Sequence, residues 1–525
     1  MTERTNVTDG FQPITGYLRR HARATPDHRA LVCSDAELSY AQLDALTDRV
    51  AASLQREGLG PGDVIGICAA TSFAYVAVFL GALRAGVVVA PMTGSSTADQ
   101  LAGMLDNARA RLVFIDRSTA ALLEGQGRAR TCITMDDDAA GMPLGRWLMP
   151  AGTVPTPVDI EPQWAFNIIY SSGTTGLPKG ILHSHERRFI QSVRLSSSFG
   201  YGPEMVLMVA TPLYSNATLF TFFSALLAGG TVALMPKFDV KRFVALAASL
   251  RATHTMLVPA QYRNIMALPD LDAHDLSSFA LKFCMGAPFA ASLKAEVLAR
   301  WPGGLIEFYG SSEGTGSTVL LAHEHPHKLH TVGKPSAGND IRIVDTEGRE
   351  VEQGGLGEIV GRSDTMMDAY HGQDPARMRD MEWFDPAGRR FLRSGDIGRF
   401  DEDGFLEIVD RKKDMIISGG FNVYPSDVEA VLRGHPAVAE AAVVGVPSER
   451  WGETPVAFVV RRGEPQGTHE QEMMAWLNGS VGKTQRVSAL HFIDQLPRSE
   501  IGKVLKRELR DRYVAMAGAA DQPAA

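Results

Sequence analysis

Residues 165–180 read "AFNIIYSSGTTGLPKG", an apolar run that leads into a loop of small residues and ends on one lysine. The part from Tyr170 to Gly180 holds three glycines, two serines and two threonines. Glycines let a backbone turn where side chains would clash, hydroxyls add hydrogen-bond donors, and Lys179 adds a compact positive charge. This composition suits a loop wrapped around an anion such as a polyphosphate. An ordinary surface turn has the same composition, so the remaining sequence has to decide between them.

The size and charge of the chain restrict the classes of protein to consider. A chain of 525 residues is expected to form two or more domains. Its 45% hydrophobic and 21% charged content is that of an ordinary globular protein. The net charge of −8 argues against a nucleic-acid surface or an anionic membrane as the main partner. Phosphate binding therefore has to be local.

Cysteines and apolar segments indicate a cytoplasmic protein in a reducing compartment. The four cysteines form no C-x-x-C pair, which excludes a zinc ribbon and gives no disulfide framework: Cys33, Cys68, Cys132 and Cys284. The start, "MTERTNVTDG", has no apolar core of a signal peptide. The longest apolar stretch, "FTFFSALLAGGTVALM", is divided by Gly229 and Gly230, and we expect a buried helix, a turn and a strand there instead of a membrane span.

Helix and strand patterns alternate through the first 300 residues. Ser39 and Gln42 fit a capping box that opens an amphipathic helix. Apolar segments such as "VIGICA" (64–69), "VVVAPM" (87–92) and "TVALM" (231–235) are typical of buried strands. This βαβα order predicts an α/β fold with parallel sheets covered by helices on both faces.

The pattern changes near residue 340 to short strands with tight turns, and Asp403-Gly404 predicts a hairpin. After "DRKKD" (410–414) the chain has its own strands and helices, enough for a small α+β domain of about 110 residues. We predict a large domain over residues 1–411, which includes a small β-barrel-like part, and a small mobile domain over 412–525. The tail "AMAGAADQPAA" (515–525) is expected to be disordered.

The lysine loop does not match a Walker A motif. Pro178 precedes Lys179, and Gly180 follows where a hydroxyl that binds Mg²⁺ is required. These two mismatches therefore argue against a P-loop kinase or ATPase.

Four segments together resemble the adenylate-forming superfamily, and in particular its acyl-CoA synthetase and 4-coumarate:CoA ligase branch. Besides the lysine loop, they are "FYGSSEGTG" (308–316), "RSGDIGRFDEDGFLEIVDRKKDMIISGGFNVYPSDVE" (393–429) and "LPRSEIGKVLKRELR" (496–510). They occur in the family's order across almost the whole chain. The resemblance implies an enzyme that activates a carboxylic acid with ATP.

The chemistry of activation explains why a lysine is needed. A carboxylate is a poor acylating agent, and its conversion to an acyl-adenylate provides pyrophosphate as leaving group. Cations must offset the repulsion between the carboxylate and the polyphosphate. By resemblance Lys503 bridges the carboxylate and the α-phosphate and is the catalytic residue. The alternative is a solvated lysine in a basic helix, because Lys506, Arg507 and Arg510 follow at helical spacing.

The resemblance also assigns the nucleotide contacts. Glu313 would bind Mg²⁺, Tyr309 would face the adenine, and Ser312 would donate to the α-phosphate. Asp396 would accept both ribose hydroxyls, and Arg411 would add a ribose or phosphate contact. Outside these motifs, a buried tyrosine, a turn serine and hairpin-surface charges would be the simpler interpretation. The other ATP or AMP contacts implied are Ser171, Ser172, Gly173, Thr174, Thr175, Gly176, Lys179, Gly310 and Ser311.

Residues 410–413 correspond to the family's hinge, with Lys413 at the pivot. Rotation of the small domain lets one pocket serve two half-reactions. Gly419 and Gly420 would line the tunnel for the CoA thiol, because a pantetheine arm needs close approach to backbone. Asn422 occupies the position of a polar residue near the phosphate.

Several positions depart from the family. Ser215 in "TPLYSNATLF" replaces the usual histidine or tryptophan. Met285 replaces a small residue and Phe289 follows it, and both could narrow one wall of the acyl site. Ile417 stands where coumarate ligases have lysine, which weakens the case for that branch. The residues predicted to line a mixed polar and aromatic acyl pocket are Tyr214, Ser215, Asn216, Met285 and Gly286. They do not distinguish aromatic, alicyclic and aliphatic acids.

Histidines provide two further candidates. The segment "HEHPHKLH" has the spacing of metal ligands at His323, His325, His327 and His330, but it lacks a partner cysteine or carboxylate arrangement, so a solvated loop is preferred. "HSH" (183–185) is interpreted as the start of a helix.

The predicted function is that of an ATP-dependent acyl- or aryl-CoA synthetase with ATP, Mg²⁺ and CoA as cofactor and co-substrates. The alternatives are a stand-alone enzyme that loads a carrier protein, a luciferase-type oxygenase, and a non-catalytic nucleotide-binding homologue. No L-G-G-x-S carrier segment follows Lys503, which argues only against a fused carrier. We expect small-molecule partners, no nucleic acid and no membrane span, with a homodimer as the oligomeric state to test.

Overall fold

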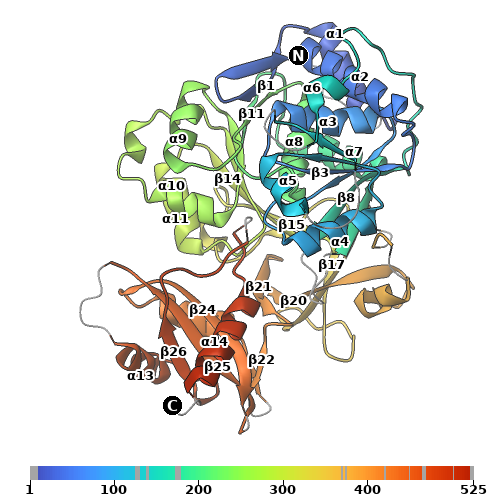
Figure 1. Ribbon diagram of the computed structural model, residues 1–525. Helices are drawn as coiled ribbons and strands as arrows, with labels where there is room; N and C mark the ends of the chain where they lie inside the picture. Colours follow the sequence, from blue (N-terminus) through green and yellow to red (C-terminus); the bar gives the residue numbers. More distant parts are fainter. Residues whose placement is uncertain are drawn as a thin grey trace. The chain divides into compact units, whose positions relative to one another are not determined.

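The computed structural model describes residues 10–124, 131–136, 141–171, 179–367, 370–372, 375–418, 421–448, 450–463, 469–499 and 502–520. Contacts divide the chain into two compact units, whose elements are labelled in Figure 1. The first comprises residues 1–329, 336–339 and 362–382, and the second comprises 330–335, 340–361 and 383–525. The predicted domain boundary between residues 411 and 412 lies within the second unit and stays a prediction.

One sheet of the first unit has the strand order β15-β14-β13-β12-β10-β11-β1-β2. Its strands pair in parallel, except that β14–β15 and β1–β2 are antiparallel. The bounds are β1 (Arg29–Cys33), β2 (Ala36–Ser39), β10 (Val206–Val209), β11 (Thr231–Leu234), β12 (His254–Leu257), β13 (Leu281–Cys284), β14 (Gly304–Gly310) and β15 (Ser317–Leu321).

The other sheet of this unit has the order β7-β6-β5-β3-β4-β8-β9, and its β8–β9 pair is antiparallel among parallel neighbours. The bounds are β3 (Val64–Cys68), β4 (Val88–Pro91), β5 (Leu112–Ile115), β6 (Thr131–Thr134), β7 (Met142–Pro143), β8 (Ala165–Ser171) and β9 (Lys179–Ser184). The continuous apolar strands thus form mostly parallel sheets, as predicted.

Helices cover these sheets. α2, α3 and α8 share one core with both sheets, in which Val50, Phe79 and Phe223 pack with Ile65 and Val232. α4 packs against β3 and β9, and α9, α10 and α11 form a separate group beside β14 (Figure 1). The bounds are α1 (Ile14–Ala24), α2 (Tyr40–Arg56), α3 (Phe73–Arg84), α4 (Ala98–Ala108), α5 (Arg117–Leu123), α6 (Leu144–Trp147), α7 (His185–Ser198), α8 (Asn216–Ala228), α9 (Val240–Ser249), α10 (Pro259–Met266) and α11 (Ala291–Arg300).

Local sequence features explain where these helices start and stop. Gln42 N donates to Ser39 Oγ at 3.3 Å and Ser39 N donates to Gln42 Oε1 at 2.8 Å, so the predicted capping box is confirmed. Gly229 takes the left-handed conformation (φ +81°) that ends α8 before β11, which confirms the predicted helix, turn and strand. No helix of the described residues is long and apolar enough to cross a membrane.

The second unit contains two smaller sheets. One has the order β17-β18-β20-β19 with β21 paired to β20, and the other has the order β23-β22-β25-β24 with β26 paired to β25. The predicted hairpin at Asp403-Gly404 connects β20 to β21, and Gly404 has φ +78°. The strand bounds are β16 (Lys334–Pro335), β17 (Asn339–Val344), β18 (Gly357–Ser363), β19 (Glu382–Phe384), β20 (Arg390–Phe400), β21 (Leu406–Arg411), β22 (Ile416–Ser418), β23 (Phe421–Val423), β24 (Val438–Ser448), β25 (Gly452–Arg461) and β26 (Ala489–Phe492).

Three helices accompany the last sheet: α12 (Pro425–Arg433), α13 (Glu470–Ser480) and α14 (Lys506–Ala520). α14 packs on β24 through the buried Leu509. The prediction of a disordered tail from residue 515 is wrong for residues 515–520, because α14 continues to Ala520. Alanine has the highest helix propensity of all residues, and this segment is rich in it. Residues 521–525 lie outside the described part of the chain.

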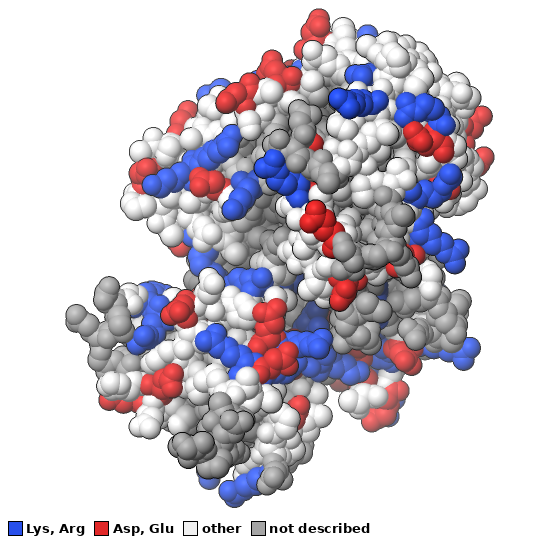
Figure 2. Space-filling view, viewed as in Figure 1, with Lys and Arg blue, Asp and Glu red and all other residues white. Residues whose placement is uncertain are grey.

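Charged side chains of both signs stand near one another over much of the visible surface (Figure 2). This mixed pattern agrees with the low density of net charge in the sequence.

Candidate active site

The lysine loop connects two antiparallel strands. Ser171 at the end of β8 pairs with Lys179 at the start of β9. The predicted contacts Ser172, Gly173, Thr174, Thr175 and Gly176 lie outside the described residues. Gly180 follows the loop at a crowded point, since a Cβ there would lie 2.9 Å from Ile168 Cγ2 and 3.2 Å from the Tyr170 ring. A glycine is needed here because the two strands approach so closely.

Both ends of the lysine loop are held by other parts of the first unit. The Tyr170 hydroxyl donates to Asn107 Oδ1 of α4 at 2.7 Å. The Asn107 side chain in turn donates to the His371 carbonyl at 3.4 Å. The His371 backbone N–H donates to the Gly180 carbonyl at 2.7 Å. These bonds join the strand before the loop and the strand after it through one asparagine and the segment 370–372.

The turn after β14 carries the predicted adenine and metal residues. Tyr309 and Gly310 are the last residues of β14, Ser311 is exposed, and Ser312 and Glu313 are half-buried. Segment 363–367 fastens this turn: Ser363 Oγ donates to the Gly314 carbonyl at 3.2 Å, and Met367 N donates to the Glu313 carbonyl at 2.9 Å. Gly314 has φ +78°, and a Cβ there would lie 2.6 Å from Met366 Cα.

Tyr370 connects the turn after β14 with the lysine loop. Its hydroxyl donates to Glu313 Oε1 at 3.2 Å, and the Lys179 ammonium lies 5.0 Å from the centre of its ring. Its backbone bridges to Ile181 of β9, and only 4% of the residue is exposed. Burial and the Glu313 carboxylate raise the pKa of the Tyr370 phenol, so the hydroxyl stays protonated and acts as a donor.

A buried polar network supports the same turn from β9. His183 Nε2 lies 3.0 Å from the Ser312 carbonyl oxygen, and its Nδ1 lies 3.4 Å from Arg188 Nη2. Arginine can only donate, so Nδ1 accepts and Nε2–H donates to the carbonyl. Burial, followed by the charge of Arg188, lowers the pKa of His183 well below its usual value, so the ring is neutral. Arg188 Nε also donates to Asn167 Oδ1 at 3.0 Å, and burial lowers the pKa of Arg188 to about 9.

Sequence analysis did not single out Tyr370 or Arg188, and it interpreted "HSH" as a helix start. That interpretation is confirmed for Ser184, which caps α7 by accepting from Arg187 N at 3.3 Å. His183 has the additional contact to Ser312. The one sequence signal for this network is the placement of His183 and Arg188 on apolar faces, where a polar residue needs a partner.

The predicted acyl-pocket residues lie on two elements of the first unit. Ser215 occupies the N-cap position of α8 without capping it, and Asn216 starts the helix with a buried Oδ1 that has no hydrogen-bond donor among the described residues. Met285 packs against the aromatic cluster of Phe283 and Phe308. Tyr214 is half-buried, and Gly286 is exposed with φ +97°.

Phe289, which the sequence suggested as a second residue that narrows the acyl site, is buried, and its ring stacks on Tyr262 of α10 with centroids 5.2 Å apart. The Lys294 ammonium of α11 lies 5.8 Å from the centre of the same ring. The suggestion that Phe289 narrows the acyl site stays a prediction.

The two predicted ribose residues lie side by side in the second unit. Asp396 of β20 is the register partner of Arg411 of β21, and Arg411 Nε donates to Asp396 Oδ1 at 2.8 Å. The Asp396 side chain is 8% exposed and the Arg411 side chain 49%. The pair therefore presents a fixed carboxylate edge beside an accessible guanidinium.

The predicted hinge and thiol-tunnel residues also belong to this unit. Lys413 is exposed in the turn after β21, and Asn422 is exposed on β23 opposite Ile417. Gly419 and Gly420 lie outside the described residues.

Lys503 is exposed in a tight turn before α14. Ser499 N donates to the Lys503 carbonyl at 2.9 Å, and Lys503 N donates to Ser499 Oγ at 3.2 Å. Gly502 supplies the left-handed residue of the turn with φ +76°, and Arg498 donates to its carbonyl at 2.8 Å. The turn is therefore stabilised by residues close to it in sequence.

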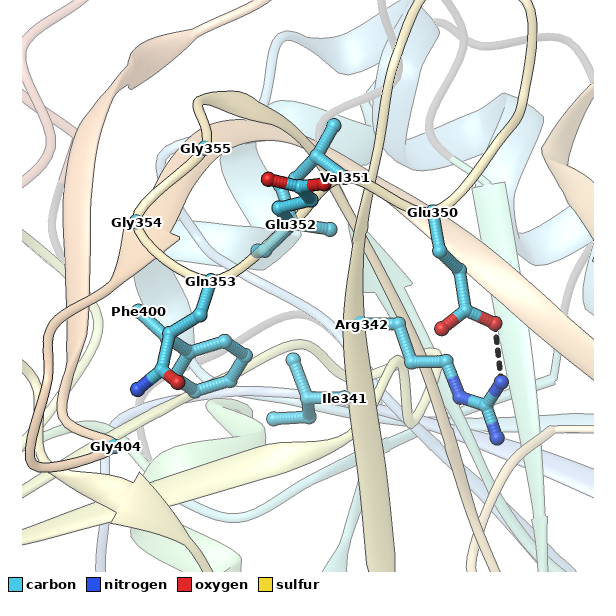
Figure 3. Close-up of a pocket in the computed structure, with 11 residues that line it drawn as sticks. Ile341, Arg342, Glu350, Val351, Glu352, Gln353, Gly354, Gly355, Phe400 and Gly404 are labelled. Carbon is cyan, nitrogen blue, oxygen red and sulfur yellow. Dashed lines mark hydrogen bonds and ion pairs between the residues drawn. The ribbon is translucent and has the colours of Figure 1, made fainter.

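Neither the histidine segment nor the cavity in Figure 3 has the features of a catalytic centre. Among the described residues no group of three or more His, Cys, Asp or Glu side chains is placed to hold a metal ion. The cavity, of about 310 Å³, lies between β17, the turn at 350–355 and Phe400 (Figure 3). Arg342, its one cationic lining residue, is already paired with Asp340 and Glu350.

A unit with two mostly parallel sheets and a separate smaller unit agree with the fold predicted for an adenylate-forming enzyme. Family models agree: the AMP-binding enzyme model matches residues 18–371, and the AMP-binding enzyme C-terminal domain model matches residues 427–503. The chain belongs to the AMP-binding enzyme family, which confirms the predicted superfamily and fold class.

Known proteins of this family are similar along their full length. The fatty acid–[acyl-carrier-protein] ligase ScoC of Streptomyces coeruleorubidus is 31% identical, with 94% of this chain and 95% of that protein covered. A feruloyl-CoA synthase of an Amycolatopsis species is 32% identical, with 94% and 98% covered. The structure of ATP-bound MatB from Rhodopseudomonas palustris matches with a TM-score of 0.85 at 29% identity, covering 96% of this chain and 100% of that one.

Proposed function

We propose that the chain is an ATP-dependent acid–thiol ligase that works in two half-reactions. In the first, a carboxylate oxygen bonds to the α-phosphorus of ATP, and the bond between that phosphorus and the oxygen bridging to the β-phosphate breaks. The products are acyl-AMP and pyrophosphate. In the second, the sulfur of CoA bonds to the acyl carbon, AMP leaves, and the thiol proton is released. The products are an acyl-CoA and AMP.

The observation that carries this proposal is the meeting of Lys179 and Glu313 at Tyr370. An ammonium group and a carboxylate from segments far apart in sequence contact the same tyrosine, the first through its ring and the second through its hydroxyl. A cation beside a potential metal ligand is the combination that a polyphosphate with its counter-ion requires. Mg²⁺ bound with ATP uses one or two carboxylates plus phosphate oxygens, so Glu313 alone is a sufficient protein ligand. When bound, Mg²⁺ would supply charge neutralisation for the leaving pyrophosphate.

Residues of the second unit would complete the reaction. In the proposal, Asp396 accepts from the ribose hydroxyls, Arg411 adds a contact to the ribose or a phosphate, and Lys503 neutralises charge as the acid meets the α-phosphate. Asp396 is suited to its task because Arg411 already orients it through a 2.8 Å hydrogen bond. Lys503 is suited because its position in a turn leaves the side chain exposed.

A carrier protein is the second candidate acceptor. The similarity to ScoC, which is named as a carrier-protein ligase, favours it. Large apolar side chains near the predicted thiol segment are also exposed, namely Ile417 at 52% and Phe421 at 62%. Either acceptor would use the same adenylation half-reaction.

The acceptor can be tested by supplying the enzyme with an accepted acid, ATP, Mg²⁺ and either free CoA or a phosphopantetheinylated carrier protein. The proposal predicts an acyl-CoA thioester, detected by mass spectrometry, together with one AMP per thioester. Acyl-AMP that accumulates in the presence of CoA and disappears only with the carrier protein would favour the second candidate.

A further inference from the structure

Two groups that the proposed function assigns to nucleotide binding, Lys179 and Glu313, are connected by a residue beside β9 (Lys179–Ser184). Lys179 is the first residue of this strand, and the backbone bridge between Ile181 and Tyr370 places Tyr370 next to it. Tyr370 then reaches Glu313, which belongs to the turn after β14 in the other sheet of the first unit. The tyrosine is therefore the side chain through which the lysine loop and the metal carboxylate contact each other.

Besides the 3.2 Å approach of its hydroxyl to Met381 Sδ, Tyr370 makes two chemically different contacts with the groups assigned to the nucleotide. Its hydroxyl donates to Glu313 Oε1 at 3.2 Å, which fixes one carboxylate oxygen and leaves the other lone pairs available. Its ring lies 5.0 Å from the Lys179 ammonium, within the range of a cation–π attraction. One contact depends on the oxygen atom and the other on the ring, so they can be separated by mutation.

The surroundings of Tyr370 make it a rigid support. The residue is 4% exposed, and its neighbour His371 donates to the Gly180 carbonyl at 2.7 Å. The Glu313 backbone is also fixed, through the 2.9 Å bond from Met367. A carboxylate that is held in place before its ligand arrives loses less conformational entropy on binding.

We propose that Tyr370 is a positioning residue that sets the Glu313 carboxylate for the Mg²⁺ of bound ATP through its hydroxyl and holds the Lys179 ammonium at the phosphate loop through its ring. This inference rests on the proposed function, because it takes Glu313 and Lys179 as nucleotide-site groups.

The two contacts predict different defects. Tyr370→Phe keeps the ring and removes the hydroxyl, so the Mg²⁺ concentration for half-maximal binding of ATP should rise about three- to tenfold, as expected for one lost hydrogen bond to a carboxylate. At saturating Mg²⁺ its ATP affinity should be close to that of the unmodified enzyme. Tyr370→Leu removes both contacts, so its ATP affinity should also fall about two- to fivefold at saturating Mg²⁺.

The first measurement is the rise in melting temperature that ATP causes, recorded at increasing Mg²⁺ concentrations in the absence of any acid. The second is the Mg²⁺ dependence of ATP–pyrophosphate exchange. Tyr40→Phe is the matched control, because that buried hydroxyl donates to the Gly230 carbonyl at 2.7 Å in the same unit. It should lower the basal melting temperature without changing the half-maximal Mg²⁺ concentration. An unchanged Mg²⁺ dependence in Tyr370→Phe, or an equal change in Tyr40→Phe, would overturn the proposal.

A double-mutant cycle tests whether Tyr370 acts on the Mg²⁺ dependence through Glu313. In a Glu313→Gln background, Tyr370→Phe should change the Mg²⁺ dependence by less than twofold, because the carboxylate that it positions is gone. Additive effects would overturn the proposal, since they would show that Tyr370 acts elsewhere. The proposed function fails if no acid supports ATP–pyrophosphate exchange. If ATP binding still requires Mg²⁺ in that case, the Mg²⁺ titration of the melting temperature decides the role of Tyr370. The absence of any ATP-dependent shift would contradict both.

Discussion

The nucleotide-site candidates of the two units are supported in contrasting ways. In the first unit, Ser312 and Glu313 are held by buried side chains of distant segments, His183 and Tyr370. In the second unit, Lys503 is exposed and its backbone is held by a serine four residues earlier. The first arrangement fixes groups before a ligand arrives, whereas the second presents a cation on a short local turn. Positional accuracy is thus built into the candidates of the first unit, whereas the candidate lysine of the second is held through its own backbone.

The largest effect is expected from Lys503→Ala. Adenylation, measured by ATP–pyrophosphate exchange, should fall about 10²–10³-fold because one electrostatic contact to the developing charge is lost. The melting temperature should change little, since the hydrogen bonds to Ser499 come from the Lys503 backbone N–H and carbonyl, which alanine retains. Lys483→Ala, at another exposed lysine of the same unit, is the matched control and should retain activity.

The same variant should spare the second half-reaction. Thioester formation from pre-made acyl-AMP should fall much less than adenylation, because no phosphate bond is formed there. Equal losses in both steps would show that the role assigned to Lys503 is wrong.

Asp396→Asn tests a carboxylate of the second unit that Arg411 orients. The KM for ATP should rise about ten- to hundredfold, because a charge-assisted hydrogen bond to the ribose is worth about 1.5–3 kcal/mol. The turnover number at saturating ATP should change less. Asp403→Asn, in the exposed hairpin that follows β20, should leave KM unchanged, and a similar rise in that control would point to a general loss of structure.

His183→Leu tests the buried support of the first unit. The change leaves the Ser312 carbonyl and one arm of Arg188 without a partner, at a cost of about 1–3 kcal/mol in the free energy of unfolding. Exchange activity should fall about three- to tenfold, a loss of about 1 kcal/mol in transition-state stabilisation. His21→Leu removes a comparable bond to the Leu227 carbonyl, 2.9 Å long. This control should lower the free energy of unfolding without lowering exchange activity. An equal loss of activity in both variants would show that His183 has no specific role in supporting the turn after β14.

The smallest effect near neutral pH concerns buried histidines of the first unit. Burial lowers the pKa of His185 and of His254 to about 4. The unfolded chain therefore binds protons at a higher pH than the folded protein does. The free energy of unfolding is fully present above about pH 6.5 and declines toward pH 4, by at most about 1.4 kcal/mol per pH unit for each histidine. Thermal melts should show this slope, and His254→Phe should reduce it. The same change at the exposed His330 should not, and a pH-independent melt of the unmodified enzyme would contradict the assignment.

Sequence patterns predicted the architecture and family well for physical reasons. Parallel strands that are buried on both faces have continuous apolar runs, and "VIGICA" and "TVALM" both form such strands. The Asp403-Gly404 turn placed β20 and β21 side by side, and the neighbouring positions of Asp396 and Arg411 follow from that pairing. Sequence rules that act over a few residues therefore predicted the part of the site that one hairpin forms.

Contacts between distant segments were not predictable in this way. Tyr370 meets Lys179 and Glu313 only after two sheets have formed, and no periodicity marks it. Phe289 follows Met285 closely in sequence, yet its ring turns into the core onto Tyr262. The helical end of α14 was missed because small residues were taken as a sign of disorder, although alanine favours a helix.

The central claim is that this enzyme activates a carboxylic acid by joining it to AMP, and acid-dependent exchange of labelled pyrophosphate into ATP tests it most directly. The enzyme should be incubated with ATP and Mg²⁺ and with aromatic, alicyclic and aliphatic acids in turn. We predict exchange that depends on at least one class of acid and falls about 10²–10³-fold in Lys503→Ala. Silence with every acid, or exchange that proceeds equally well without acid, would contradict the claim.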